Sequence, residues 1–288
     1  MLQNLSPKSW FTEASEETGV AFSLHLKAHL HHEVTPYQTI DVYDTTTFGH
    51  LMTIDGLTMV SERDNFIYHE MMTHPALFAH PDPASVAIIG GGDCGTLREV
   101  LKHNDVKSAV QIEIDERVTR VAEQFFPDLC GSNDDPRCQL LFDDGIAWVN
   151  SQPDQSLDIL IIDSTDPVGP AEGLFSRPFY QQASRVLKPN GILIQQSESP
   201  LLHDTLIQSM HFAMREAGFT DTATLTFPLC SYPSGWWSAT LASCELLKRQ
   251  PREDKIIGSR LSMRYYNEHV HRASFALPQF LQTLLNQV

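Results

Sequence analysis

The spacing of hydrophobic residues changes along the chain and divides it into two regions. Residues 34–60, VTPYQTIDVYDTTTFGHLMTIDGLTMV, are rich in β-branched and aromatic residues, with turn signals at residues 48–50 and 55–56. This pattern predicts a small antiparallel β unit. After HPDPAS, at residues 80–85, short apolar runs alternate with segments of helical period, which predicts βα units around a mainly parallel sheet.

Four apolar runs are each followed by a segment whose apolar residues have helical spacing. In one of these segments Phe179, Ala183 and Val186 lie at positions i, i+4 and i+7, so they share one helix face. The successive pairs are SVAIIG with TLREVLKH, SAVQIEI with ERVTRVAEQFF, LDILIID with RPFYQQASRVL, and GILIQQS with DTLIQSMHFAMREA. The alternation predicts an α/β fold.

The composition limits the size and the partners of the protein. The chain has 288 residues, 42% of them hydrophobic, which is enough for one large domain or for a core domain with a smaller appendage. Its 20 Lys and Arg residues against 36 Asp and Glu residues give a formal net charge of −16, which argues against nucleic acid and anionic membranes as partners. Two explanations of this charge stay open, plain solubility and a small cationic substrate.

The cysteines and the chain start predict the compartment. Five cysteines, an odd number without paired C-x-x-C spacing, indicate neither a disulfide framework nor a zinc site. The first twenty residues lack a signal-peptide pattern, and no apolar run is long enough to span a bilayer. We therefore predict a reduced, cytoplasmic protein without a metal site.

The stretch IIGGGDCGTLREV, residues 88–100, places a glycine loop between a strand and a helix. Gly90, Gly92 and Gly95 have the spacing G-x-G-x-x-G of a nucleotide-binding turn, so we predict that this loop contacts the cofactor. A pyrophosphate at such a turn is held by backbone N–H groups, and the carboxylate of Asp93 would repel it. Asp93 therefore indicates a ligand with a positively charged end.

Acidic residues follow almost every predicted strand. They are Asp93, Glu113 in QIEID, Asp144 in FDDGIAW, Asp163 and Asp166 in DSTD, and Glu198 in SES. A single acid at a strand end is as often a helix cap, but ligands of an open parallel sheet lie beyond the carboxyl ends of its strands. Carboxylates around one crevice raise each other's pKa unless cations fill it, so we predict a polyamine ligand.

Two of these acids suit a nucleoside. Glu113 ends the second strand about twenty residues after the glycines, where an acid accepts hydrogen bonds from ribose hydroxyls. Asp144 precedes a predicted helix, so it either accepts from an adenine amine while capping that helix or acts as a cap alone.

Beyond these motifs, the chain resembles the polyamine aminopropyltransferases, the spermidine synthase family. The resemblance rests on blocks that occur in the family's order: YQTIDVYDTTTFGHLMTIDGLTMVSERDNFIYHEMMTHPALFAHP, GGGDCGTLREVLKH, IEID, DDG, DSTDPVGPAEGLFSRPFY and YYNEHVHRASFALPQF. It implies an N-terminal β domain, placed at residues 1–65, and a Rossmann-like catalytic domain with a methyltransferase-type, mainly parallel sheet at residues 66–288.

The resemblance also implies an activity. The aminopropyl group of decarboxylated S-adenosylmethionine would pass to a diamine, with putrescine the first choice, and give spermidine and methylthioadenosine. Decarboxylated S-adenosylmethionine is then a co-substrate, no prosthetic group is expected, and the family suggests a homodimer or homotetramer. Two alternatives stay open: an S-adenosylmethionine-dependent methyltransferase, which needs a partner for the methionine carboxylate, and a non-catalytic polyamine-binding protein.

Site residues follow from the resemblance position by position. Gln38, Glu113, Asp144, Gly145 and Pro170 match positions that hold the nucleoside. Tyr68, His69, Asp93, Asp163, Asp166 and Tyr232 match the polyamine contacts, and Asp163 matches the proton acceptor. Ordinary packing remains the alternative for the two tyrosines. The chain departs from the family at Cys94, where a glycine or small residue is usual, and at the bulky Trp236 and Trp237, which leaves the diamine open.

Overall fold

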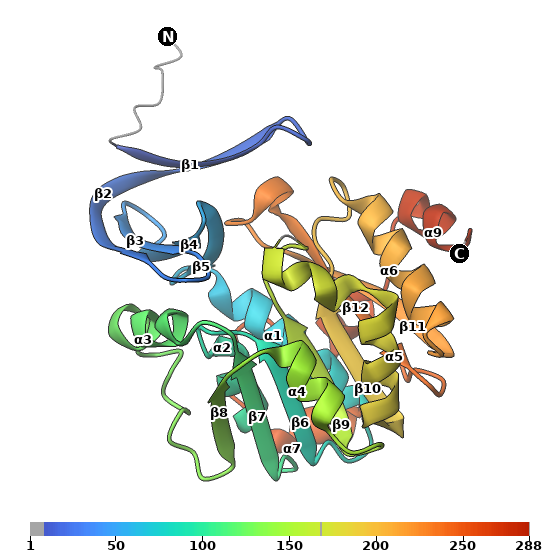
Figure 1. Ribbon diagram of the computed structural model, residues 1–288. Coiled ribbons are helices and arrows are strands. Elements are labelled where there is room, and N and C mark those ends of the chain that lie inside the picture. The colour runs from blue at the N-terminus through green and yellow to red at the C-terminus, as the bar shows by residue number, and fades with distance from the viewer. Residues whose placement is uncertain (1–8, 168, 288) are drawn as a thin grey trace.

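The protein consists of two β-sheets with helices packed around them, as seen in a computed structural model (Figure 1). The structure describes residues 9–167 and 169–287. The smaller sheet lies at the carboxyl ends of the central strands of the larger one (Figure 1). Within these described residues, no helix combines the length and the apolar character needed to cross a membrane.

The N-terminal sheet has five antiparallel strands that follow one another in chain order. They are β1 (Trp10–Ser15), β2 (Val20–Val34), β3 (Thr39–Thr45), β4 (His50–Ile54) and β5 (Leu57–Ser61). The predicted turn between β4 and β5 is present, and Asp55 and Gly56 have φ values of 51° and 81°. Two successive positive φ angles are the geometry of a tight two-residue hairpin. Strand β1 and nearly all of β2 lie outside the predicted β unit, although β2 has apolar residues at every second position from Val20 to Leu30.

The larger sheet has seven strands in the order β11-β12-β10-β9-β6-β7-β8. They are β6 (Ser85–Gly90), β7 (Ser108–Glu113), β8 (Cys138–Phe142), β9 (Leu157–Asp163), β10 (Leu187–Gln196), β11 (Asp221–Pro228) and β12 (Trp236–Ser243). Strand β12 runs antiparallel to β10 and β11, and the other neighbours are parallel. The predicted fold class, a Rossmann-like parallel sheet with a small antiparallel domain, is therefore confirmed.

Alternate residues of the central strands face two helical layers. In β6, Val86 and Ile88 pack into one layer, and Ala87 and Ile89 into the other. The first layer contains α1 (Asn65–Ala79), α2 (Gly95–Leu101), α7 (Glu253–Ser259) and α8 (Glu268–Ser274). The second contains α4 (Gly145–Ser151), the 3₁₀-helix η1 (Gly169–Phe175), α5 (Arg177–Val186) and α6 (Asp204–Glu216), with α9 (Gln279–Leu285) beside α6. Period-two burial of this kind is what a sheet covered on both faces requires.

Helix α3 (Glu116–Phe125) connects the two sheets. Its Val118 and Val121 pack with Ile40 and Val42 of the N-terminal sheet. The helix also begins at a side-chain cap, since the Asp115 carboxylate accepts from the N–H of Arg117 at 3.0 Å. Burial of this apolar face fixes the smaller sheet above the strand ends of the larger one.

Helix α1 was not predicted, because it is buried on nearly all sides and has no single apolar stripe. The carboxylate of its buried Glu70 accepts hydrogen bonds from the N–H groups of Arg264, Tyr265 and Tyr266, each at 2.8 Å. These bonds tie the C-terminal segment to α1. The predicted domain division, after residue 65, falls at the start of this helix and stays a prediction.

Candidate active site

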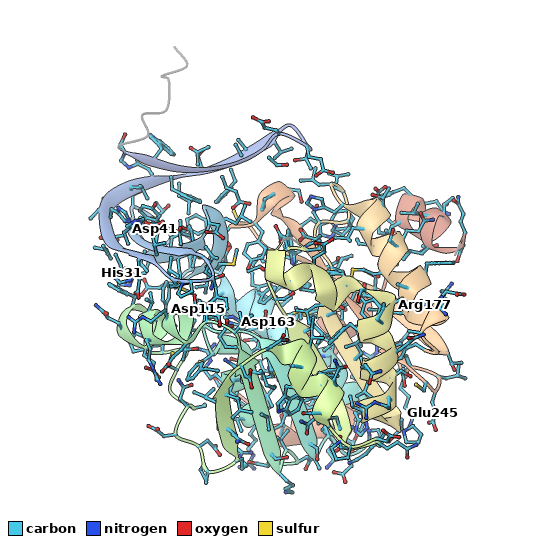
Figure 2. All side chains as sticks on the ribbon, viewed as in Figure 1. His31, Asp41, Asp115, Asp163, Arg177 and Glu245 are labelled. Atoms are coloured by element: carbon cyan, nitrogen blue, oxygen red, sulfur yellow. The ribbon has the colours of Figure 1, made fainter. Side chains whose placement is uncertain are left out.

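A cavity of about 280 Å³ lies where β6, β7 and β9 end, between the two sheets. The chain reverses its direction of progress across the sheet between β6 and β9, which is where open α/β sheets bind ligands. Ten predicted site residues line the cavity: Gln38, Tyr68, Gly90, Gly92, Asp93, Glu113, Asp144, Gly145, Asp163 and Tyr232. Figure 2 shows Asp163 at the centre of the molecule and Arg177 and Glu245 at its periphery.

Two predicted residues do not line the cavity, and the side chain of a third is not described. Neither His69 nor Asp166 is among the described residues that line the cavity. His69 lies behind Asp93, and Asp166 lies farther along the loop that follows β9. The side chain of Pro170 lies outside the described part of the chain, although its backbone belongs to η1.

The glycine loop allows the end of β6 to touch Asp163. Gly90 has a φ of 83°, and a Cβ atom at this position would overlap the carbonyl oxygen of Asp163. The N–H of Gly91 donates to that same carbonyl at 2.7 Å. A Cβ atom on Gly92 would stand 2.8 Å from Oε2 of Glu113. Glycine is therefore required at both positions for the two acids to keep their places.

Cys94 has a φ of 67°, so this departure from the family leaves a non-glycine residue in the left-handed region. Such a conformation costs about 1–2 kcal/mol. The thiol is buried, with the carbonyl of Gly92 at 3.7 Å and the amide of Gln111 at 3.8 Å. These contacts hold the strained residue in place at the start of α2.

Asp163 is the last residue of β9, and both of its carboxylate oxygens accept hydrogen bonds. The hydroxyl of Tyr68 donates to Oδ1, and that of Thr96 donates to Oδ2, each at 2.6 Å. Burial, and then the negative charge of Asp93, raise the pKa of Asp163, although the two hydrogen bonds oppose the rise. Its position and raised pKa make Asp163 a suitable proton acceptor.

Asp93 forms an ion pair with His69. Oδ2 of Asp93 lies 3.1 Å from Nε2 of His69, and Oδ1 accepts from the N–H of Gly95 at 2.7 Å. Burial alone would raise the pKa of Asp93. The charge of His69 and these hydrogen bonds together lower that pKa by more than burial raises it, so the net shift is downward. Burial lowers the pKa of His69, while Asp93 raises it more, and the net shift is upward. Asp93 therefore remains an anion at neutral pH.

The other half of the cavity combines apolar walls with three polar groups. Glu113 is 8% exposed, and burial raises its pKa to about 7, even though the N–H of Asp115 donates to it at 2.9 Å. Gln38 reaches in from the N-terminal sheet and donates to Asp115 at 3.0 Å. Asp144 caps α4 through the N–H groups of Ile146 and Ala147 at 2.7 and 3.1 Å, and both of its predicted roles include this cap. The apolar walls come from Met52, Ile54, Ile112, Ile114, Val118, Ala171 and Leu174.

Two tyrosines form an aromatic wall beside Asp163. The rings of Tyr68 and Tyr232 are 5.8 Å apart, and the hydroxyl of Tyr232 donates to the carbonyl of Met59 at 2.6 Å. Trp237 packs edge-on behind Tyr232 at 4.6 Å, and Trp236 contacts Phe280. Neither tryptophan is among the described lining residues, so Trp237 supports the wall from behind.

Asp166 belongs to a second acidic group with Glu198. Burial, and then the neighbouring Glu198 carboxyl, raise the pKa of Asp166 to about 9. Nδ1 of His203 lies 3.2 Å from the Glu198 carboxylate. Glu198 is buried and has a φ of 63°, a strained conformation that often marks functional positions.

Three residues of this region were not assigned from the sequence. Thr96 directly follows the glycine motif, and Asp115 follows Glu113 by two residues and caps α3. Glu198 was recognised as an acid at a strand end but received no role. For Thr96 and Asp115, the sequence offered one signal, their closeness to residues that were assigned a role. The pairing of Glu198 with Asp166 depends on the fold and has no such signal.

Two family models match the chain. Residues 65–251 match the spermine/spermidine synthase domain, and residues 9–62 match the spermidine synthase tetramerisation domain. Among curated relatives, the polyamine aminopropyltransferase of Methylococcus capsulatus is 59% identical over 281 residues and covers 98% of both chains. The polyamine aminopropyltransferase of Thioalkalivibrio sulfidiphilus is 58% identical over 278 residues, covering 96% of this chain and 98% of the relative.

Solved structures of similar proteins have the same fold. A spermidine synthase in complex with the transition state analogue AdoDATO superposes with a TM-score of 0.93 at 33% identity, covering 100% of this chain and 99% of the other. The spermidine synthase from Thermotoga maritima gives a TM-score of 0.91 at 33% identity, covering 99% and 98%. With family models over both sheets and relatives aligned along nearly its whole length, the chain belongs to the polyamine aminopropyltransferase family.

Proposed function

We propose that the protein transfers the aminopropyl group of decarboxylated S-adenosylmethionine to putrescine and forms spermidine and methylthioadenosine. The observation that carries the proposal is the arrangement of Asp163, with its raised pKa, beside the anionic Asp93 in one cavity. This arrangement suits two cationic substrates, one of which has to lose a proton before it reacts.

The nucleoside of the co-substrate fits the half of the cavity with apolar walls. In this proposal Glu113 accepts hydrogen bonds from the ribose hydroxyls, Gln38 and Asp144 contact the nucleoside, and Gly90 and Gly92 leave room for it. Its aminopropyl ammonium group then faces Asp93. The carboxylate of ordinary S-adenosylmethionine would meet this negative charge instead, which disfavours a methyltransferase.

The reaction requires a free amine. A diamine nitrogen has a pKa near ~10, similar to that of lysine, so it arrives protonated at neutral pH. Asp163 takes that proton, and the nitrogen lone pair then attacks the methylene carbon bonded to the sulfonium. The new N–C bond forms as the C–S bond breaks, and the bonding electrons pass to sulfur, which leaves as the neutral thioether methylthioadenosine. Tyr68 and Thr96 orient the Asp163 carboxylate for this step.

The second ammonium group of the diamine is assigned to the acidic pair formed by Asp166 and Glu198. The tyrosine wall of Tyr68 and Tyr232 would line the hydrocarbon chain between the two ends. Putrescine is proposed because the resemblance favours it. His69 acts in this scheme by keeping Asp93 charged.

Assembly and location also remain proposals. Because residues 9–62 match a tetramerisation domain, we propose a homo-oligomer. Sedimentation velocity distinguishes the two predicted states, a homodimer and a homotetramer. The five cysteines are free, which agrees with the cytoplasmic location proposed from the sequence.

The assay that tests the function mixes the protein with decarboxylated S-adenosylmethionine and putrescine and follows both products by chromatography. We expect equal amounts of spermidine and methylthioadenosine, because one transfer forms one of each. Parallel reactions contain ordinary S-adenosylmethionine, or cadaverine in place of putrescine. Methyl transfer without aminopropyl transfer would contradict the proposal, and so would polyamine binding without turnover; faster reaction with cadaverine would contradict the choice of putrescine.

Replacement of Asp163 by asparagine tests the proton acceptor. Asp163→Asn should lower kcat by roughly 10² to 10⁴, the usual effect of losing a positioned base, while leaving methylthioadenosine affinity within about twofold. Asp82→Asn, at an exposed acid, is the matched control. Retention of more than half the wild-type kcat by Asp163→Asn would remove Asp163 from this role.

Replacement of Asp93 by asparagine tests selection of the co-substrate. Asp93→Asn should weaken decarboxylated S-adenosylmethionine and reduce the penalty against S-adenosylmethionine. A lost charge-assisted hydrogen bond costs about 1.5–3 kcal/mol, so the ratio of the two affinities should fall by about tenfold or more. Competition binding measures this ratio, and an unchanged ratio would show that Asp93 only shapes the loop or contacts the diamine.

The pH dependence of putrescine binding tests the second acidic group. With the pKa of Asp166 raised to about 9, the Asp166–Glu198 pair holds a proton at neutral pH that an incoming ammonium has to displace. The KM for putrescine, measured with saturating co-substrate, should therefore fall as pH rises from about 7 to about 9, before the diamine itself loses protons near ~10. Asp166→Asn should flatten this dependence and Asp82→Asn should not. Equal slopes in all three proteins would rule out the assignment.

A further inference from the structure

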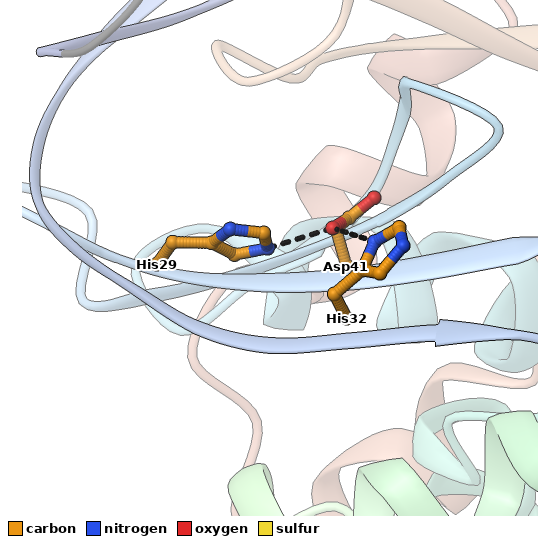
Figure 3. Close-up of side chains that lie close together, drawn as sticks. All are labelled: His29, His32 and Asp41. Carbon is orange, nitrogen blue, oxygen red and sulfur yellow. Dashed lines mark hydrogen bonds and ion pairs between the residues drawn. The ribbon is translucent and has the colours of Figure 1, made fainter.

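Two histidines and an aspartate of the N-terminal sheet point their side chains at one another (Figure 3), and none of the three is among the described residues that line the cavity. Nε2 of His29 lies 2.7 Å and Nδ1 of His32 lies 2.9 Å from Oδ1 of Asp41. One ligand atom from each residue lies within 4.8 Å of the others. Two imidazoles and one carboxylate are a donor set that first-row divalent metals prefer, Zn²⁺ among them.

A β-bulge in β2 brings the two histidines to the same face of the sheet. Residues three apart in a regular strand point to opposite faces. Here the pairing register shifts between His29 and His31, so that His29 stands opposite Tyr43 and His32 opposite Asp41. Because Asp41 and Tyr43 are two residues apart on β3, their partners share one face. The bulge is thus the feature that assembles the three side chains.

We propose that His29, His32 and Asp41 form a Zn²⁺-binding site on the β2–β3 pair. In tetrahedral sites Zn–N and Zn–O bonds are about 2.0–2.2 Å long, so neighbouring ligand atoms lie about 3.3 Å apart. Each imidazole nitrogen therefore has to move about half an ångström away from Oδ1 of Asp41, and the two nitrogens, now within 4.8 Å of each other, have to reach the same 3.3 Å spacing. His29 and His32 side chains are 46% and 57% exposed, which leaves them room to do so. Three protein ligands leave the fourth position for water.

The residues around this cluster favour a bound metal ion over two histidines that bind nothing. The ring of His29 stacks on Tyr43 with 4.6 Å between the centroids, which fixes its plane toward Asp41. Asp41 is only 13% exposed, so its negative charge is poorly hydrated and gains from a cation. The adjacent His31 is engaged with Glu33 at 3.1 Å. His31 therefore supplies a matched position on the same strand that takes no part in the site.

The site links to the proposed active site through the chain. Asp41 lies three residues after Gln38, which lines the cavity and donates to Asp115. An ion that joins β2 to β3 would hold the strand that begins directly after Gln38. We therefore assign the ion a structural role, that of fastening this strand pair.

Isothermal titration calorimetry of Zn²⁺ into the assembled, metal-stripped protein tests the site. We expect one equivalent per chain at micromolar or tighter affinity and a higher melting temperature with Zn²⁺ than with Mg²⁺. His29→Ala, His32→Ala and Asp41→Asn should each weaken this binding by about tenfold or more, since each loses a direct ligand. His31→Ala should bind as the wild type does. Co²⁺ in place of Zn²⁺ should give the visible absorption of a tetrahedral site.

Three results would overturn the proposal. One is the absence of saturable binding in the wild type. Another is equal loss of affinity in His31→Ala and His32→Ala, which would place the ion elsewhere. The third is half an equivalent per chain, which would mean that two copies share the ion. Circular dichroism of each variant confirms that the sheet is intact, and failure of the proposed aminopropyl transfer would leave all of these readouts unaffected.

Discussion

The active-site geometry depends on holding the carboxyl groups of Asp93 and Asp163 near each other in a buried cavity, although their charges repel. The fold manages this by giving them different partners. Asp93 is paired with His69 and stays charged, whereas the carboxylate of Asp163 accepts from the neutral hydroxyls of Tyr68 and Thr96 and has a raised pKa. Neighbouring acids with pKa values shifted in opposite directions mark a division of labour, here between a fixed anion and the proposed proton acceptor.

The same constraint explains why cations suit this protein. Carboxylates taken out of water without partners are costly, and at the second acidic group the cost appears as the raised pKa of Asp166 and of Glu198, which burial causes in both. An ammonium group satisfies such acids with charge-assisted hydrogen bonds, so binding offsets a cost that the empty protein already bears. A molecule with a carboxylate at either end would add to that cost. Selection therefore follows from charge as well as from shape.

Local patterns predicted much of the larger sheet, and long-range packing decided what they missed. Strands β6 and β9 have the predicted bounds, since each contains four consecutive buried apolar residues, at 86–89 and 159–162, that are visible in the sequence. Helix α1 escaped because burial on all sides removes its stripe. Strand β10 begins four residues before the predicted Gly191, because Leu187 pairs with Leu157 ahead of a register shift. The His29–His32–Asp41 cluster was absent from the predictions since only the bulge brings it together, whereas the predicted acids met because parallel strands end at one edge.

The N-terminal sheet completes the cavity, so the two parts of the chain act as one structure around the ligand. Gln38 and Thr35 both bond to Asp115, the cap of α3, at 3.0 and 2.7 Å. The hydroxyl of Tyr232 bonds to Met59 of β5, and the buried Asp64 accepts from the N–H of Ser231 at 2.9 Å. Both ends of the cavity are thereby fastened to the smaller sheet by groups that line it or adjoin it. Gln38 directly precedes β3, and Tyr232 is bonded to β5, so a shift of β3 relative to β5 would change the spacing of these two lining residues. The stiffness of the smaller sheet therefore bears on how accurately the two proposed substrates are aligned.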